Sequence, residues 1–210
     1  MNNLVQKVAW VIAIVGFAIG LVGLYQRLTL GHTAANYGSY VPWGLWVAAY
    51  IYFIGLSAGA FLMSALVYVF RIKIFKPIGK LALFTALVTL VAAMFSIWMD
   101  LGHPERAWKM ILNTNFGSMM GWMAWLYSAY FVLLMLELWF AMRADMAACA
   151  GEPGFKGKLC GFLTFGRKDT SQEAVDKDMN LLRILGTIGV PLAIAFHGGV
   201  GALFGVVGAR

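Results

Sequence analysis

Charged residues are scarce in this sequence. Lys, Arg, Asp and Glu make up 12% of its 210 residues and hydrophobic residues make up 61%, with a mean hydropathy of +0.79. A soluble globular chain is typically about 25% charged and about 45–50% apolar. The composition therefore excludes a soluble domain. The net charge of +7 does not indicate nucleic-acid binding, because no basic stripe lies on a segment that could fold in water.

Cysteine and histidine are also rare, with two and three residues. Cys149 and Cys160 share one polar segment with no histidine near them, so they form no zinc or iron–sulfur pattern. A b-type haem held by two histidines needs both at matched depth on facing helices. Only His197 lies in an apolar run, which argues against such a haem. We therefore expect no haem or metal in this chain.

Long apolar runs account for most of the chain. A transmembrane helix needs about 20 mostly apolar residues, whereas barrel strands would alternate in polarity at every second residue. The first run is too long for the apolar part of a signal peptide, so we assign it as the first span. We predict an all-α, polytopic membrane bundle that forms a single membrane domain over residues 1–210. Its five transmembrane helices would cover residues 8–26, 41–70, 78–99, 116–142 and 184–207.

Lysine and arginine are distributed unevenly between the segments that join these spans. If the N-terminus is cytoplasmic, the inner segments hold twelve bases and the outer segments four. The loop 71–80 has four bases and no acid, and short loops determine orientation. We predict a multi-pass protein of the inner (cytoplasmic) membrane, with its N-terminus in the cytoplasm and its C-terminus on the outer side. Segment 143–183 would be a cytoplasmic loop with reduced thiols.

Small residues recur at four-residue spacing within the spans. Such pairs let helix backbones approach closely, which favours helix association in lipid. We expect close packing at each pair. Gly198 and Gly199, beside His197, either mark another tight crossing or leave room for a ligand. The four pairs are Gly16/Gly20, Gly55/Gly59, Gly117/Gly121 and Gly201/Gly205.

Polar side chains within the spans are costly and need a structural or functional reason. Hydroxyl groups usually bond back to their own helix, which we expect for Ser57, Ser64, Ser118, Ser128 and Thr187. Glu137 lies near the inner end of its span, where it either reaches the cytoplasmic surface or takes part in proton movement. His197 falls near the membrane midplane or in its outer half. A structural role and a functional role both remain open for it.

The predicted topology gathers aromatic and titratable residues at the outer end. An aromatic belt would explain the tryptophans, and Asp100 and Arg106 could form a structural ion pair. A carboxylate and two histidines beside indole and phenol rings also suit a quinol, which releases two protons on oxidation and needs an apolar ring site. The residues at this end are Pro42, Trp43, Trp46, Asp100, His103, Glu105, Arg106, Trp108, Asn115, Ser118, Trp122 and Tyr127, with His197 approaching from within the membrane.

Four sequence blocks at these positions resemble the NrfD/PsrC family, the membrane subunits of polysulfide-reductase-type complexes. The resemblance extends from about Tyr40 to the C-terminus, although segment 143–183 has no recognisable counterpart. The blocks are V-P-W-G-L-W-V-A-A-Y-I-Y-F-I-G-L-S-A-G-A, D-L-G-H-P-E-R-A-W, N-F-G-S-M-M-G-W-M-A-W-L-Y and H-G-G-V-G-A-L-F-G.

The resemblance implies a subunit that binds menaquinone or ubiquinone as its substrate. It would exchange electrons between the quinone pool and a ferredoxin-like iron–sulfur subunit, which works with a molybdopterin enzyme or a multihaem cytochrome. By position in the blocks, Asp100 and His197 would be catalytic. Ser57 and Glu137 could belong to a proton path. The residues that would bind the quinone are Trp43, Gly44, His103, Arg106, Trp122, Tyr127 and His197.

The number of spans departs from the family. Its members usually have eight or more, so five indicate a short or truncated member that a second membrane chain could complete. A structural membrane anchor without a quinone site is the alternative function. A transporter would favour internal repeats or broken helices, and no repeat between the spans is convincing.

Overall fold

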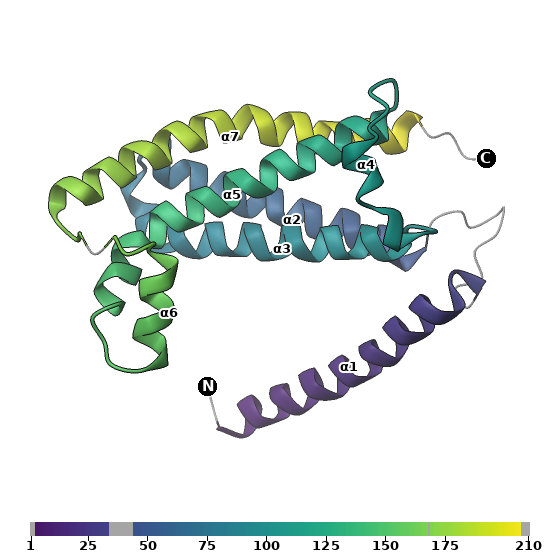
Figure 1. Cartoon of the computed structure of the whole chain (residues 1–210), viewed down its shortest axis with the longest axis horizontal. Coiled ribbons are helices and arrows are strands. Elements are labelled where there is room, and N and C mark those ends of the chain that lie inside the picture. Colours follow the sequence, from purple (N-terminus) through teal and green to yellow (C-terminus); the bar gives the residue numbers. More distant parts are fainter. Residues whose placement is uncertain (1–2, 34–43, 168, 207–210) are drawn as a thin grey trace.

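The computed structural model describes residues 3–33, 44–167 and 169–206, and all regular structure in this part of the chain is helical (Figure 1). Within these residues five helices are long and apolar enough to cross a membrane, which agrees with the predicted all-helical membrane bundle. They are α1 (Asn3–Leu30), α2 (Leu45–Tyr68), α3 (Gly79–Asp100), α5 (Met119–Cys149) and α7 (Gln172–Val206). The shorter elements are α4 (Lys109–Leu112), α6 (Phe155–Leu163) and the 3-10 turns Lys73–Ile78 and Pro104–Arg106.

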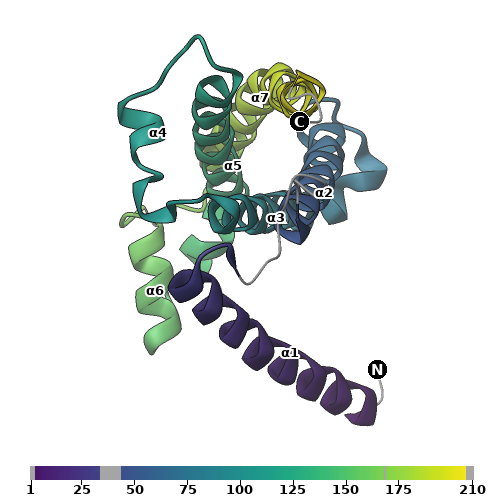
Figure 2. The ribbon, with the colours of Figure 1, turned by 90° about the vertical axis from the view of Figure 1, so that its right-hand side faces the viewer.

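Four of the long helices form one bundle. In the end-on view of Figure 2, α2, α3, α5 and α7 surround a common core. Large side chains fill this core. Those that are less than 2% exposed include Leu83, Leu90, Tyr130, Leu134 and Phe196. The outward faces remain apolar because lipid, rather than water, is the expected solvent there.

Helix α1 diverges from this bundle along most of its length (Figures 1 and 2). Its apolar window is fully exposed, but Arg27 near its C-terminus is buried against the end of α3. The Arg27 guanidinium donates hydrogen bonds to the carbonyl oxygens of Met99 at 2.7 Å and Leu101 at 2.5 Å. Met99 is in the last turn of α3 and Leu101 is its C-cap residue, and helices leave such carbonyl acceptors unsatisfied at this end. Arg27 therefore caps α3 from another helix.

Ion pairs organise the opposite end of the bundle. The Arg143 side chain on α5 pairs with Asp178 on α7, and both are buried. Arg143 also donates to the carbonyl oxygen of Asp169 at 2.7 Å. Lys80 on α3 and Asp145 on α5 form an exposed pair at 2.5 Å. The polar ends of three helices are thus connected on this side of the molecule.

The predicted loop 143–183 is largely helical. Helix α5 continues to Cys149, α7 begins at Gln172, and α6 lies between them. The apolar runs end earlier than these helices because a helix can continue into a polar environment once its charges are paired, as those of Arg143 and Asp178 are. Hydropathy therefore predicted the spans and missed the helical extensions beyond them.

The prediction of free thiols is wrong for this structure, because Cys149 and Cys160 form a disulfide. The turn between α5 and α6 brings their Cα atoms to 6.0 Å, within the range that a disulfide can bridge. A disulfide is typical of an oxidising compartment, whereas the excess of basic residues favours a cytoplasmic position for this segment. The orientation of the chain in the membrane stays a prediction.

The glycines at close helix crossings are not the ones that four-residue spacing predicted. A Cβ atom added to Gly55, Gly59, Gly201 or Gly205 would meet no atom within 4 Å, and the same holds for both glycines of the α1 pair. At Gly121 it would collide with the backbone of its own segment. The tight crossings instead involve Gly186, Gly189 and Gly199 of α7, which pack against Val69, Phe61 and Met123. The four-residue spacing identifies a row of small residues along a helix. It does not show whether that row faces a neighbouring helix or the outside of the bundle.

Substitution of Gly189 by Ala is expected to destabilise the bundle. The new Cβ would lie 2.7 Å from Cζ of Phe61 and 3.0 Å from Cδ2 of Leu133, and both of these side chains are buried. Overpacking of this kind typically costs about 1–3 kcal/mol. Thermal unfolding in one detergent should show a loss for Gly189→Ala. The matched variant Gly59→Ala adds its methyl group to open space and should lose nothing; equal losses would contradict the packing described here.

Candidate functional site

An apolar pocket of about 460 Å3 lies between α3, segment 101–111 and α5, at the end of the bundle where α3 terminates. The exposed side chains of Val91, Phe95 and Trp98 contribute to its rim, so the pocket opens on the outer surface of the bundle. A ligand could enter it sideways from the bilayer. The pocket is lined by Val91, Met94, Phe95, Ile97, Trp98, Leu101, Ala107, Met110, Ile111, Ala124, Tyr127, Ser128 and Phe131.

Hydrogen bonds from tryptophan hold the outer wall of this pocket in place. The Trp98 indole donates to the carbonyl oxygen of Pro104 at 2.8 Å, which fixes the segment that follows α3. The Trp125 indole donates to the Thr114 hydroxyl at 2.9 Å, which fixes the segment that precedes α5. The non-helical backbone here is therefore anchored to both helices that form the pocket.

Tyr127 and Ser128 are the hydroxyl residues of the lining. Ser128 donates to the carbonyl oxygen of Ala124 at 2.9 Å, as expected for a serine within a membrane helix. The Tyr127 ring packs edge-on against Phe196, with ring centroids 4.4 Å apart. Its hydroxyl is buried close to the Tyr50 side chain and makes no hydrogen bond of standard geometry with a described residue. Tyr127 thus connects the pocket with the core of the bundle.

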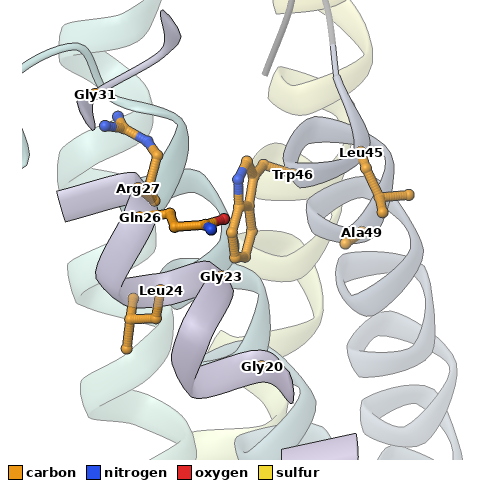
Figure 3. Close-up of a pocket in the computed structure, with 9 residues that line it drawn as sticks. All are labelled: Gly20, Gly23, Leu24, Gln26, Arg27, Gly31, Leu45, Trp46 and Ala49. Carbon is orange, nitrogen blue, oxygen red and sulfur yellow. The ribbon is translucent and has the colours of Figure 1, made fainter. Parts of the chain in front are cut away.

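A second pocket of about 430 Å3 lies between α1 and α2 (Figure 3). The Trp46 indole lies between the two helices, and the Gln26 side chain points toward it (Figure 3). Arg27 also lines this pocket, while its guanidinium is engaged with the end of α3 and with His32 at 3.1 Å. Arg27 therefore connects this pocket with the C-terminal end of α3.

Asp100 is the last residue of α3 and is half-buried. Its neighbour Leu101 lines the pocket between α3 and α5, and the carbonyls of Met99 and Leu101 accept hydrogen bonds from Arg27. Asp100 is thus adjacent in sequence to a residue that lines the pocket, but it lines neither pocket itself.

His103 and Arg106 lie outside both pockets, in the exposed segment beyond α3. His103 Nδ1 is 3.0 Å from Glu105, and Arg106 is 3.6 Å from the same carboxylate. The backbone N–H of Glu105 and the His103 side chain both stabilise its charged form, so the pKa of Glu105 is lower than usual. Arg106 thus pairs with Glu105 at the exposed surface.

Trp122 and Gly44 also do not line the pocket between α3 and α5. Trp122 is exposed and donates from its indole to the carbonyl oxygen of Phe116 at 2.9 Å. Gly44 caps the N-terminus of α2 near the other pocket, and Trp43 lies outside the described residues. The structure therefore divides the predicted quinone residues among several places.

His197 lies inside the bundle and lines neither pocket. Its Nδ1 atom donates to the carbonyl oxygen of Ala193 at 2.6 Å, so in the neutral ring Nε2 carries the lone pair. Nε2 is buried near the Ile54 backbone, without a well-formed hydrogen bond among the described residues. The His197 ring packs against Tyr130 and Phe196, at centroid distances of 5.7 and 4.7 Å.

Glu137 is 2% exposed, which rules out the interpretation that it reaches the cytoplasmic surface. It faces the bundle interior near Gly186 of α7, and its Oε1 atom has no hydrogen bond among the described residues. Ser57 also departs from expectation, because it donates to the carbonyl oxygen of Ala86 on α3 at 2.8 Å rather than to its own helix. Ser64 and Thr187 do bond back to their own helices.

Sequence reasoning missed several residues of this region. Arg27 counts only as an outer base in the sequence, since the apolar run ends just before it. Tyr50 and Tyr130, which are 2% and 0% exposed, give no signal because aromatic residues are ordinary in membrane helices. Trp98 and Phe131 line the pocket from different helices, and no spacing along one helix relates them.

A family model described as polysulphide reductase, NrfD matches residues 33–210. The chain belongs to the NrfD family. This match confirms the resemblance inferred from the four sequence blocks, and it includes every residue that lines the pocket between α3 and α5. The α1 residues that line the other pocket precede the matched region.

Curated NrfD-type relatives extend the comparison. The chain is 43% identical to a selenate reductase subunit of Mesobacillus selenatarsenatis, over 91% of this chain and 46% of the relative. It is 37% identical to the Hdr-like menaquinol oxidoreductase integral membrane subunit of Archaeoglobus fulgidus, over 58% of this chain and 31% of the relative. It is 31% identical to the menaquinone reductase integral membrane subunit of Nitratidesulfovibrio vulgaris, over 58% of this chain and 29% of the relative. The chain spans less than half the length of each of these relatives.

Proposed function

We propose that this NrfD-family chain is the quinol-binding membrane subunit of a respiratory oxidoreductase complex. The pocket between α3 and α5 supports this proposal most strongly. Its volume of about 460 Å3 is in the range of small-molecule sites. Aromatic side chains wall it, and its exposed rim gives a lipid-soluble ring a lateral route from the bilayer.

The chemistry of the neighbouring residues fits a quinol. Oxidation of one quinol to the quinone releases two electrons and two protons, so the site needs a proton acceptor near each ring oxygen. We assign Tyr127 to the ring pocket and Asp100, next to the lining residue Leu101, to proton transfer at its outer end. His197 lies behind Tyr127 across the Phe196 ring and would receive a proton inside the bundle. The electrons pass to an iron–sulfur partner subunit.

The names of the relatives support the same class of ligand and assembly. Two of them are named for menaquinol or menaquinone, and a third is a subunit of a selenate reductase. We therefore propose menaquinol as the substrate. A ferredoxin-like subunit and a molybdopterin enzyme or a multihaem cytochrome would complete the complex. His103 and Arg106, exposed beyond α3, are then available to contact such a partner.

Buried polar groups inside the bundle also support coupling to proton movement. Tyr130 packs against His197, and its hydroxyl lies near Ser57. Glu137 lies two turns further along α5, about 10 Å from Tyr130. Isolated polar groups in a membrane interior are costly and commonly mark proton pathways. We propose that these groups form an inward route from the quinol site.

Filling the pocket between α3 and α5 is the direct test. The variant Ala124→Phe places a ring in this pocket and should raise the Kd for a short-tailed menaquinone analogue at least about tenfold, or about 1.4 kcal/mol. Ala49→Phe is the matched control, because Ala49 is also a half-buried helical alanine but lines the pocket between α1 and α2. The Kd of each variant is measured from the retention of the radiolabelled analogue by the purified chain in lipid nanodiscs.

The outcomes separate the competing functions. A loss of affinity confined to Ala49→Phe would move the quinol site to the pocket between α1 and α2. No saturable binding by the unmodified chain would favour a structural membrane anchor without a quinone site. A loss confined to Ala124→Phe is the result that the proposal requires.

A further inference from the structure

Helix α6 and the residues after it present an apolar ridge that the bundle does not cover. Phe155, Phe162 and Phe165 are 82%, 74% and 79% exposed, and Leu159 is exposed between them. Phe155, Leu159 and Phe162 are separated by four and three residues, so they share one face of the helix. Four neighbouring large apolar side chains exceed the scattered exposure that is normal on a protein surface in water.

The opposite face of α6 is held firmly against α5. Gly157 and Thr164 are buried on that face, and a Cβ at Gly157 would collide with the carbonyl oxygen of Glu152 in the turn between α5 and α6. The Cys149–Cys160 disulfide joins the two helices, and the Trp139 indole donates to the Leu163 carbonyl oxygen at 2.7 Å. The ridge therefore points away from the protein in a fixed direction.

The direction of α6 is that of a helix lying in the plane of a membrane. Its axis runs across the bundle axis in the side view of Figure 1 and in the end-on view of Figure 2. The C-terminal end of α6 accepts a hydrogen bond from Trp139 of α5. Trp139 lies six residues before Asp145, so it is about 9 Å closer to the middle of α5 than Asp145 is. The exposed Lys80–Asp145 pair marks the polar boundary. Helix α6 thus lies at the depth where interfacial helices insert.

The charges around the ridge are mostly basic. Residues 150–167 contain Lys156, Lys158 and Arg167 against one acid, Glu152, which is 3.0 Å from Lys156. Lys156 and Lys158 are both exposed and belong to the same helix as the ridge. Lysines beside an apolar face are typical of helices that bind an anionic lipid surface.

We propose that α6 is an in-plane membrane anchor. Its ridge inserts at the boundary between headgroups and acyl chains, and its lysines contact anionic headgroups of the same leaflet. The two pockets lie at the other end of the bundle, beside the C-terminus of α3, so a partner that exchanges electrons there would leave α6 uncovered. The anchor would hold the α5 end at a constant depth, and it does not depend on quinol binding.

Photocrosslinking from the ridge tests this proposal. Phe162 is replaced by p-benzoylphenylalanine, which preserves its ring, in the full chain within native membranes. Mass spectrometry after irradiation should find lipid adducts, as at a control position on the exposed face of α3, Val88. The same probe in place of Glu173, which is exposed near the start of α7, should yield none.

The lipid composition tests the role of the lysines. In vesicles of mixed phosphatidylcholine and phosphatidylglycerol, adducts at position 162 should be enriched severalfold in phosphatidylglycerol over its share of the bilayer. Lys156→Gln together with Lys158→Gln should abolish this enrichment while adducts persist. Crosslinks from position 162 to another protein, or a yield as low as that at position 173, would overturn the proposal.

Discussion

Replacing Asp100 with Asn is expected to reduce quinol oxidation at least about 100-fold, because a positioned general base contributes about 10²–10⁴-fold to proton transfer. Asn keeps the size of the side chain and removes its capacity to accept a proton. Asp100 is the last residue of α3 and precedes Leu101, which lines the pocket and accepts a hydrogen bond from Arg27. Turnover of a quinol by the whole complex, isolated through this chain, measures the effect.

Glu105→Gln provides the control for this prediction. It removes a carboxylate five residues away that is exposed and paired with His103 and Arg106. Its turnover should stay close to that of the unmodified protein, and both variants should recover the same partner subunits. If Asp100→Asn turned over normally within an intact complex, Asp100 would have no role in proton transfer.

Removing the buried Asp178 carboxylate is expected to have the largest effect on stability. Asp178→Ala would leave the Arg143 guanidinium buried without its counter-ion, and breaking such a pair typically costs about 3–5 kcal/mol. The hydrogen bond from Arg143 to the Asp169 carbonyl oxygen cannot replace the lost negative charge. Unfolding of the purified chain by a denaturing detergent should occur at a clearly lower concentration.

Two further variants distinguish a buried ion pair from a general effect of charge. Asp145→Ala breaks the exposed pair with Lys80 and should cost only about 0–1 kcal/mol. Arg143→Met combined with Asp178→Leu removes both buried charges and should recover much of the stability lost in Asp178→Ala. Equal losses in Asp145→Ala and Asp178→Ala would show that burial does not govern this interaction.

Among the described residues that the sequence predicted to bind the quinone, only Tyr127 lines the pocket between α3 and α5. Tyr127 and the D-L-G block do lie at one end of the bundle, because alternating spans bring the ends of α3 and the start of α5 together. Trp122 and His103 belong to the same blocks but project to the surface. Position along a helix predicts depth in the membrane, whereas the face that a side chain occupies depends on where the neighbouring helices pack.

The same distinction explains the buried polar groups and the glycines. Glu137 lies near the end of the predicted span 116–142, yet it faces α7 in the core. Gly59 belongs to one of the four glycine pairs and faces open space, whereas Gly189 belongs to none of them and lies against Phe61. Rotation of each helix about its axis decides these outcomes, and uniformly apolar spans carry little sequence signal for rotation.

The sequence by itself determined the class of this protein, its family and the five apolar helices found among the described residues. Backbone polar groups must be satisfied within each span in lipid, so long apolar runs become helices whatever surrounds them. Only the tertiary structure decided the pocket between α3 and α5, the Arg27 cap, the disulfide and the crosswise placement of α6. These features arise from contacts between distant segments, and their partners are set by packing rather than by local composition.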